Sequence, residues 1–260
     1  MCMLVALFIA TQTMEASRMV KRQTNLLEPI IFWLCTYPLG FILGIGFSLL
    51  RLTGRIRIDH PERIPKEDGA LIVASNHPSL WEPIILTMLF FPRCLLYPRR
   101  RLPWSTPSTN TYYDWWFLFP IRPRFIMVPR TDQSRIIATF RQMLAIIKDG
   151  ERLIIFPEGG RTYRGNSYQY SANGRRIRSL KSGIERLVKL TNAPVMPVWV
   201  EGSDEVLPNG SRFPRLWRRV TIVIGEPIVF PTADAHVKNA VTKKIGESLL
   251  ILSEEVTTLP

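Results

Sequence analysis

The hydrophobic pattern divides the chain into an apolar N-terminal part and a longer part in which short apolar stretches alternate with helical ones. The run from residue 30 to residue 50 contains no charge and matches the roughly 20 apolar residues that span a bilayer. From residue 55 the pattern predicts strands that alternate with helices. We therefore predict an α/β fold, with a mixed central sheet flanked by helices, preceded by an apolar membrane-associating helical segment. The expected division is a membrane-associating segment at 1–52 and one catalytic domain at 53–260.

The expected strands are short apolar runs between turn-forming residues. They cover Arg55–Asp59, Ala70–Ser75, Cys94–Tyr97, Phe125–Val128, Arg152–Phe156, Val195–Val200 and Val220–Gly225. The stretch Tyr163–Ser179 carries four arginines among Gly, Ser and Asn, and this composition predicts a mobile basic loop.

Three helices are expected in the same part of the chain. The clearest runs from Gln133 to Lys148, because its apolar residues recur at helical spacing, Asp132 can cap its start and Gly150 can close its end. A second covers Ser182–Leu190, and an amphipathic third begins at about Asp234.

Proline and glycine interrupt the long apolar run. Pro38, followed by Gly40, Gly44 and Gly46, is expected to kink or break the helix, so a re-entrant hairpin or an interfacial position suits the run as well as a straight span. Basic residues on both sides give no orientation by the positive-inside rule and favour insertion into one anionic leaflet. A hydrophobic helix packed on the domain is the alternative.

The charge of the chain indicates anionic partners. Thirty-four Lys and Arg against 21 Asp and Glu leave a net charge of +13, which suits a phospholipid surface, phosphorylated small molecules, a carrier protein or nucleic acid. No helix-turn-helix, zinc or aromatic-basic signature accompanies this charge, so we predict no nucleic-acid partner. Cys2, Cys35 and Cys94 have neither disulfide nor metal-ligand spacing, and no metal site is predicted.

A histidine and a glutamate follow the expected strand Ala70–Ser75. His77 lies in the loop, and Pro83 suits the start of a helix that would place Glu82 at its N-cap. A loop that folds back can bring the imidazole to the carboxylate, which would fix the tautomer and leave the second nitrogen free to accept a proton. A structural histidine is the alternative for this pair taken alone.

A glycine-containing segment follows the expected strand Arg152–Phe156. It reads Phe-Pro-Glu-Gly-Gly-Arg-Thr over residues 156–162. Two glycines allow close approach of the backbone to a ligand, and exposed amides beside an arginine suit a phosphate. An ordinary strand-ending turn is the alternative.

Taken in order, these residues resemble the PlsC-type glycerolipid and lysophospholipid acyltransferases, which are 1-acylglycerol-3-phosphate acyltransferase-like enzymes. The family blocks are Asn-His-x-x-x-x-Asp, a block ending in arginine, Phe-Pro-Glu-Gly-Thr-Arg-Ser and a short apolar block with a proline. The matching stretches here are Asn76–Glu82, Phe125–Arg130, Phe156–Thr162 and Val195–Val198, within about residues 55–230.

The resemblance implies direct transfer of a fatty acyl chain from acyl-CoA or an acyl carrier protein to a hydroxyl of a lysophospholipid or glycerol-phosphate-type acceptor, in phospholipid biosynthesis. The thioester would be a co-substrate, and no cofactor is implied. His77 would be the general base and Glu82 would orient it. The implied location is the cytoplasmic face of the inner or cell membrane, on an anionic surface.

The resemblance also assigns substrate-binding residues. It implies that the acceptor's phosphate is held by the loop residues Glu158, Gly159, Gly160 and Arg161 with a contribution from Arg130, and that Pro197 shapes the acceptor or acyl site. Arg99 and Arg100 fall where relatives carry a lysine near that phosphate; a solvated basic face against lipid headgroups is the alternative.

Two positions depart from the family pattern. Glu82 stands where aspartate is usual, and Gly160 replaces a threonine hydroxyl. These departures motivate a second hypothesis, a catalytically weak or inactive membrane-binding member of the same fold. A serine hydrolase using Ser79 is disfavoured, because no G-x-S-x-G elbow is present.

Overall fold

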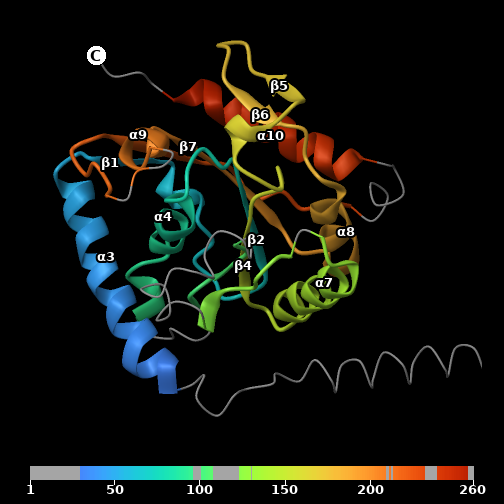
Figure 1. Ribbon diagram of the computed structural model, residues 1–260, viewed down its shortest axis with the longest axis horizontal. Coiled ribbons are helices and arrows are strands. Elements are labelled where there is room, and N and C mark those ends of the chain that lie inside the picture. The colour runs from blue at the N-terminus through green and yellow to red at the C-terminus, as the bar shows by residue number, and fades with distance from the viewer. Residues whose placement is uncertain are drawn as a thin grey trace, which may run out of the picture.

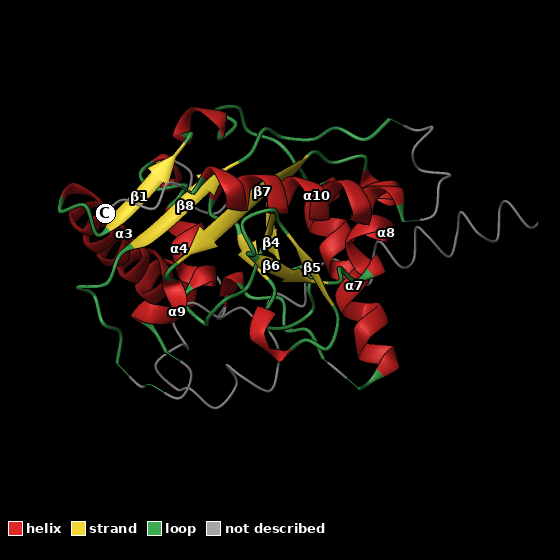
Figure 2. Ribbon diagram, turned by 90° about the horizontal axis from the view of Figure 1, so that it is seen from above, coloured by secondary structure: helices red, strands yellow, loops and turns green. Residues whose placement is uncertain are grey.

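Six strands form a mixed sheet at the centre of the molecule, with helices on both faces (Figures 1 and 2). This computed structural model describes residues 30–95, 101–107, 123–129, 131–208, 211, 213–231 and 239–256. The strand order is β1-β8-β7-β2-β4-β3, and every neighbouring pair is parallel except β7 with β8. The predicted fold class is confirmed.

Five of the expected strands are present. They are β1 (Ile56–Asp59), β2 (Leu71–Ser75), β4 (Arg152–Ile155), β7 (Val195–Glu201) and β8 (Val220–Ile224). The central strands β2, β4 and β7 are mostly apolar because both of their faces are covered, whereas the edge strand β1 alternates apolar and charged residues. Within β2, Ile72 and Ala74 pack into one core cluster while Leu71 and Val73 pack into the other.

The helices form two layers, one on each side of the sheet. The cluster that contains Ile72 also contains residues of α7 (Gln133–Lys148), α8 (Ser182–Thr191) and α10 (Ala240–Glu255). The cluster that contains Val73 includes residues of α3 (Tyr37–Leu52), α4 (Glu82–Met88) and α9 (Ser203–Val206). The site described below lies between these two layers, at the carboxyl ends of β2 and β4.

The predicted helix boundaries are confirmed within one residue for α7 and α8. The Asp132 side chain caps α7 by accepting from the Arg135 amide at 3.1 Å, and Gly150 follows the helix with a positive φ of 77°. The α8 helix ends one residue later than expected, at Thr191. The expected C-terminal helix is present as α10. Its expected start near Asp234 lies outside the described residues.

Three strand and loop predictions were confirmed only in part or were wrong. Cys94 lies in a 3-10 turn, Arg93–Leu95, and the end of that expected strand lies outside the described residues. The expected strand Phe125–Val128 is not a full strand, but Phe125 forms a parallel bridge to Ser105 of the short strand β3 (Trp104–Ser105), and the Ile126 and Val128 amides donate to the Ser105 and Pro107 carbonyls at 2.9 Å. The expected mobile loop at 163–179 instead forms a 3-10 turn, Thr162–Arg164, and an antiparallel hairpin of β5 (Tyr168–Tyr170) and β6 (Arg176–Arg178). The fully buried side chain of Ile177 anchors that hairpin.

The long apolar run forms a continuous helix in its described part rather than a hairpin. A π-helical turn, Phe32–Thr36, leads directly into α3 (Figure 1). Pro38 directly follows the π-helical turn, in which the Tyr37 N–H donates to the Phe32 carbonyl five residues earlier; such a local π turn accommodates the missing proline N–H within a continuous helix. Gly44 packs against the Phe91 ring, in space that a Cβ would fill. By length and composition, Phe32–Leu52 could cross a membrane.

Candidate active site

Two loops meet at the carboxyl ends of the parallel neighbours β2 and β4, where ligands bind in open α/β sheets. The first loop carries His77 and the second begins with Phe156. Asn76 extends the sheet beyond β2, because its side chain exchanges two hydrogen bonds of 2.8 Å with the backbone of Val200. This fixes the point at which the first loop leaves the sheet.

His77 and Glu82 form a hydrogen-bonded pair. The His77 Nδ1 to Glu82 Oε2 distance is 2.8 Å, and the imidazole also stacks on the Phe156 ring at 4.2 Å between centroids. The Glu82 side chain is fully buried, and 13% of the His77 side chain is exposed. Because a carboxylate accepts hydrogen bonds, Nδ1 carries the hydrogen and Nε2 is free to accept a proton.

Serine side chains hold the Glu82 carboxylate in place. Ser79 donates from its backbone N–H at 2.9 Å and from its hydroxyl at 2.8 Å, and the Ser203 hydroxyl donates to the same oxygen. Ser79 is buried and its hydroxyl is engaged, so it supports the pair and is not placed as a nucleophile. Helix α4 begins at Glu82, one residue earlier than expected, with Pro83 inside its first turn.

Glu158 joins the two loops through its carboxylate. Oε1 accepts from the backbone N–H of His77 at 3.0 Å and from the Thr162 hydroxyl at 2.7 Å, and Oε2 accepts from the backbone N–H of Arg178 at 2.9 Å. The Thr162 N–H in turn donates to the His77 carbonyl at 2.9 Å. Glu158 is fully buried, and this burial raises the pKa of its carboxyl above 4.5 despite the three hydrogen bonds.

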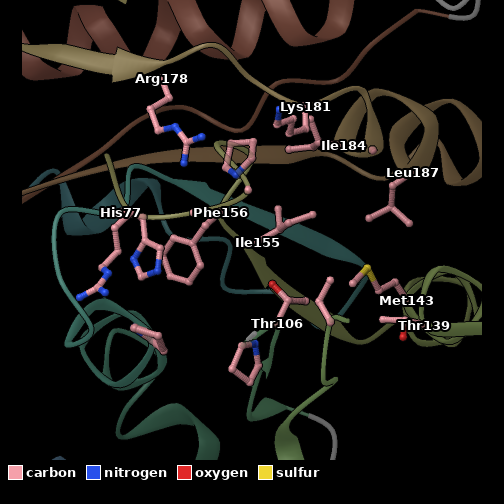
Figure 3. Close-up of a pocket in the computed structure, with 18 of the residues that line it drawn as sticks. His77, Thr106, Thr139, Met143, Ile155, Phe156, Arg178, Lys181, Ile184 and Leu187 are labelled. Atoms are coloured by element: carbon pink, nitrogen blue, oxygen red, sulfur yellow. The ribbon is translucent and has the colours of Figure 1, made fainter. Parts of the chain in front are cut away.

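A cavity of about 490 Å³ lies beside the His77–Glu82 pair. Figure 3 shows His77 and Phe156 on one side of it and Met143 and Leu187 on the other. Part of the lining is cationic, and no Asp or Glu occurs among the described residues that line the cavity. The cationic residues are Arg161, Arg164, Arg178 and Lys181; the apolar lining includes Val128, Ile136, Phe140, Met143, Ile155, Ile184 and Leu187.

The structure brings together some of the residues predicted for the site and separates others. His77, Gly159, Gly160 and Arg161 line the cavity, whereas Arg99, Arg100 and Arg130 lie outside the described residues. Gly159 adopts a positive φ of 68°, which favours glycine.

Two of the residues expected to bind substrate do not line this cavity. The Glu158 carboxylate instead accepts hydrogen bonds from the two loops. Pro197 lies within β7, packs against Gly225 and is not among the cavity-lining residues.

Sequence reasoning missed several residues of this site, including Arg164 and Lys181 of the cavity lining, and two others show why. Ser203 contacts Glu82 across 121 positions of sequence, and no local pattern marks it. Arg178 was assigned to a loop, although it ends a strand and lines the cavity. Within the described residues, no group of three or more His, Cys, Asp and Glu is arranged to hold a metal ion.

Comparisons with known proteins identify curated relatives that are named as acyltransferases. The chain is 24% identical over 195 residues to the chloroplastic 1-acyl-sn-glycerol-3-phosphate acyltransferase LPAT1 of Arabidopsis thaliana, covering 75% of this chain and 49% of that protein. It is 27% identical over 151 residues to a probable 1-acyl-sn-glycerol-3-phosphate acyltransferase of Mycoplasma pneumoniae, covering 57% and 50%. The chain thus spans about half the length of these curated relatives.

A solved structure shares the fold. The crystal structure of the 1-acyl-sn-glycerophosphate (LPA) acyltransferase PlsC from Thermotoga maritima superposes with a TM-score of 0.62 at 21% identity, covering 86% of this chain and 80% of that one. The family model described as Acyltransferase matches residues 55–201, a segment that contains His77, Glu82 and Arg161 and amounts to more than half of the chain. This protein therefore belongs to the Acyltransferase family.

Proposed function

We propose that this protein transfers a fatty acyl chain from acyl-CoA or an acyl carrier protein to a hydroxyl of a lysophospholipid or glycerol-phosphate-type acceptor. The observation that carries the proposal is the His77–Glu82 pair at the edge of a cavity that is cationic in one part and apolar in another. The names of the relatives, which are 1-acyl-sn-glycerol-3-phosphate acyltransferases, support the same reaction.

The chemistry follows from the hydrogen bond that Glu82 accepts. With Nδ1 donating to that carboxylate, Nε2 of His77 takes the proton of the acceptor hydroxyl as its oxygen attacks the thioester carbonyl carbon. The tetrahedral adduct collapses with cleavage of the C–S bond, and the leaving thiolate takes the proton back from the imidazolium. Glu82 stabilises the imidazolium between these steps.

The two parts of the cavity suit the two parts of the substrates. Apolar side chains from α7 and α8, among them Met143 and Leu187, offer a surface to an acyl chain. Arg161, Arg164 and Lys181 line the cationic part and offer charge-assisted hydrogen bonds to a phosphate. The positive φ of Gly159 shapes the backbone that presents Arg161.

The test is acyl transfer by the purified full chain, offered a panel of lysolipids with acyl-CoA or acyl carrier protein and assayed by mass spectrometry. We expect an acylated lysophospholipid product. His77→Ala should lower turnover by roughly 100- to 10,000-fold, the usual contribution of a general base. The matched control is His60→Ala, since His60 is 41% exposed and pairs with Glu62 away from the cavity.

The outcome of this panel separates the proposal from its alternative. Product formed by wild type and lost in His77→Ala supports the proposed reaction. No product from wild type with any donor or acceptor would favour a non-catalytic membrane-binding protein. Near wild-type turnover in a folded His77→Ala variant would refute the role of His77 as the general base.

We also propose that α3 anchors the protein to an anionic membrane, at the cytoplasmic face. Large apolar side chains on α3 and on the π-helical turn before it are exposed, among them Ile42 at 64% and Leu34 at 72%, respectively. Two further exposed aromatic side chains, Phe213 and Trp217, lie in the segment 213–219, which also contains three arginines. Arg55, just beyond α3, donates to the Trp217 carbonyl at 2.7 Å and links this segment to the helix.

Charge placed on the exposed face of α3 tests the anchor. The double variant Ile42→Asp/Ile45→Asp should float poorly with anionic phospholipid vesicles, because an aspartate in the bilayer interior costs about 2.5–3.5 kcal/mol. The matched control is Ile251→Asp, at a position on α10 that is 58% exposed. Equal vesicle binding by wild type, double variant and control would contradict an inserted α3.

A further inference from the structure

Arg178 presents its guanidinium to the cavity (Figure 3). It is the last residue of β6, and Figure 3 shows its side chain directed into the cavity on the side of His77 and Phe156. Among the described residues, none accepts a hydrogen bond from this guanidinium or forms an ion pair with it; its backbone N–H donates to Glu158. The cavity lining adds further cations and no carboxylate within the described chain, so this part of the cavity suits an anion.

Two glycines make room for the Arg178 side chain. A Cβ at Gly160 would lie 2.7 Å from Nη1, and a Cβ at Gly165 would lie 2.6 Å from Cγ. Neither glycine has a positive φ, so neither is required by its backbone conformation. Glycine at positions 160 and 165 therefore serves packing, because the Arg178 side chain occupies the space that a Cβ would need.

Glu158 holds Arg178 close to the proposed base. One carboxylate accepts from the backbone N–H of His77 at 3.0 Å and of Arg178 at 2.9 Å, so the two residues are fixed relative to each other. In a glycerol-phosphate acceptor, two carbons and one oxygen separate the reacting hydroxyl from the phosphorus. The pantetheine arm, in contrast, keeps the phosphates of a thioester donor far from the reacting carbonyl.

We propose that Arg178 is a further cationic ligand for the acceptor's phosphate, in addition to Arg161, and that glycine at position 160 leaves the space that its side chain needs. The inference rests on the proposed acyl transfer. It assigns acceptor selectivity to the β5–β6 hairpin. It also explains why glycine stands at position 160, where the family pattern has threonine: the Arg178 guanidinium takes the place of the threonine hydroxyl.

The test compares kcat/KM for a phosphate-bearing acceptor, lysophosphatidate, with that for a neutral one, monoacylglycerol. Arg178→Gln should lower kcat/KM for lysophosphatidate roughly 10- to 100-fold more than for monoacylglycerol, the usual size of a hydrogen bond to a charged group. Arg178→Lys should lie between Gln and wild type. The matched control is Arg176→Gln: Arg176 is on the same strand, but it stacks on Tyr168 and does not line the cavity.

Gly160→Ala tests the same contact without changing the arginine. The added Cβ meets the flexible end of the Arg178 side chain, so it should displace the guanidinium and leave the fold intact. We expect a loss selective for lysophosphatidate, and no further loss when Gly160→Ala is added to Arg178→Gln. Additive losses would show that Gly160 acts on something other than Arg178.

Three outcomes would overturn the inference. They are an unchanged kcat/KM in folded Arg178→Gln, an equal loss of kcat/KM for both acceptors, or a rise in KM confined to the acyl donor. Calorimetric binding of short-chain lysophosphatidate separates this inference from the proposed function. Weaker binding by Arg178→Gln than by wild type supports the phosphate contact even if wild type shows no turnover, whereas equal binding contradicts it.

Discussion

Two fully buried glutamates contact the same histidine in different ways. Glu82 accepts from the His77 side chain, at Nδ1, whereas Glu158 accepts from the His77 backbone N–H. The remaining partners of Glu82 are Ser79 and Ser203. The remaining partners of Glu158 are the Thr162 hydroxyl and the Arg178 backbone.

The two glutamates therefore have different roles: Glu82 acts on the protonation of the imidazole, and Glu158 acts on the position of the loop. Glu82 acts on the imidazole ring, where the hydrogen bond that it accepts from Nδ1 fixes the tautomer. Glu158 ties the loop after β2 to the loop after β4 and to the β5–β6 hairpin, so it sets where His77 lies without contacting its ring. Substitutions of Glu82 should therefore affect mainly turnover, and substitutions of Glu158 should affect mainly stability.

The largest expected effect is on turnover in Glu82→Gln. The amide removes the charge and can present its NH₂ group to Nδ1, which favours the wrong tautomer, so kcat should fall by roughly 100- to 10,000-fold. Glu82→Asp keeps the charge and should retain much more activity. Steady-state kinetics with folding checked by circular dichroism measure this, and equal kcat for Gln and wild type would remove Glu82 from the proton transfer.

A smaller effect, mainly on stability, is expected for Glu158→Gln. Glutamine offers one acceptor oxygen where two carboxylate oxygens accept from His77, Thr162 and Arg178. At least one partly buried N–H then loses its partner, which costs about 1–3 kcal/mol in the free energy of unfolding. Denaturant unfolding measures the loss.

A second glutamate provides the control for that measurement. Glu254 also accepts from a backbone N–H, that of Ala172 at 2.7 Å, but the contact is exposed and water can replace it. Glu254→Gln should therefore change stability little. A loss as large as that of Glu158→Gln would mean that burial does not distinguish the two contacts.

The sequence predicted five strands of the sheet and the contact between His77 and Glu82 because these features depend on local patterns. Apolar runs between turn residues located β1, β2, β4, β7 and β8. The spacing from His77 to Glu82, read with a strand before it and a proline after it, predicted two side chains that could meet.

The β5–β6 hairpin and the role of Glu158 could not be predicted in this way. The hairpin is rich in arginine and depends on the burial of Ile177 and on the hydrogen bond from the Arg178 amide to Glu158. Both are contacts between distant positions. The partners of Glu158 are mostly backbone donors, which every residue except proline offers, so no sequence pattern marks them.

The smallest expected effect is the pH dependence of the Glu158 contribution to stability. Burial raises the pKa of this carboxyl above its ordinary value of 4.5. The folded chain therefore binds the proton more tightly than the unfolded chain does, and the stability that this group contributes is present below about pH 4.5. It is lost as pH rises through the pKa of the folded state.

Glu158→Gln removes this titration, so the difference in unfolding free energy between wild type and variant isolates it from other titrating groups. We expect the advantage of wild type over Glu158→Gln to shrink as pH rises from about 4.5 through the raised pKa, by about 1.4 kcal/mol for each pH unit that separates the pKa of the folded chain from that of the unfolded chain. An advantage that grows with pH would mean that the amides of His77 and Arg178 outweigh burial and hold Glu158 as an anion. The expected direction also bears on the site: a carboxyl that resists ionisation places less negative charge beneath Arg178, and so opposes an incoming phosphate less.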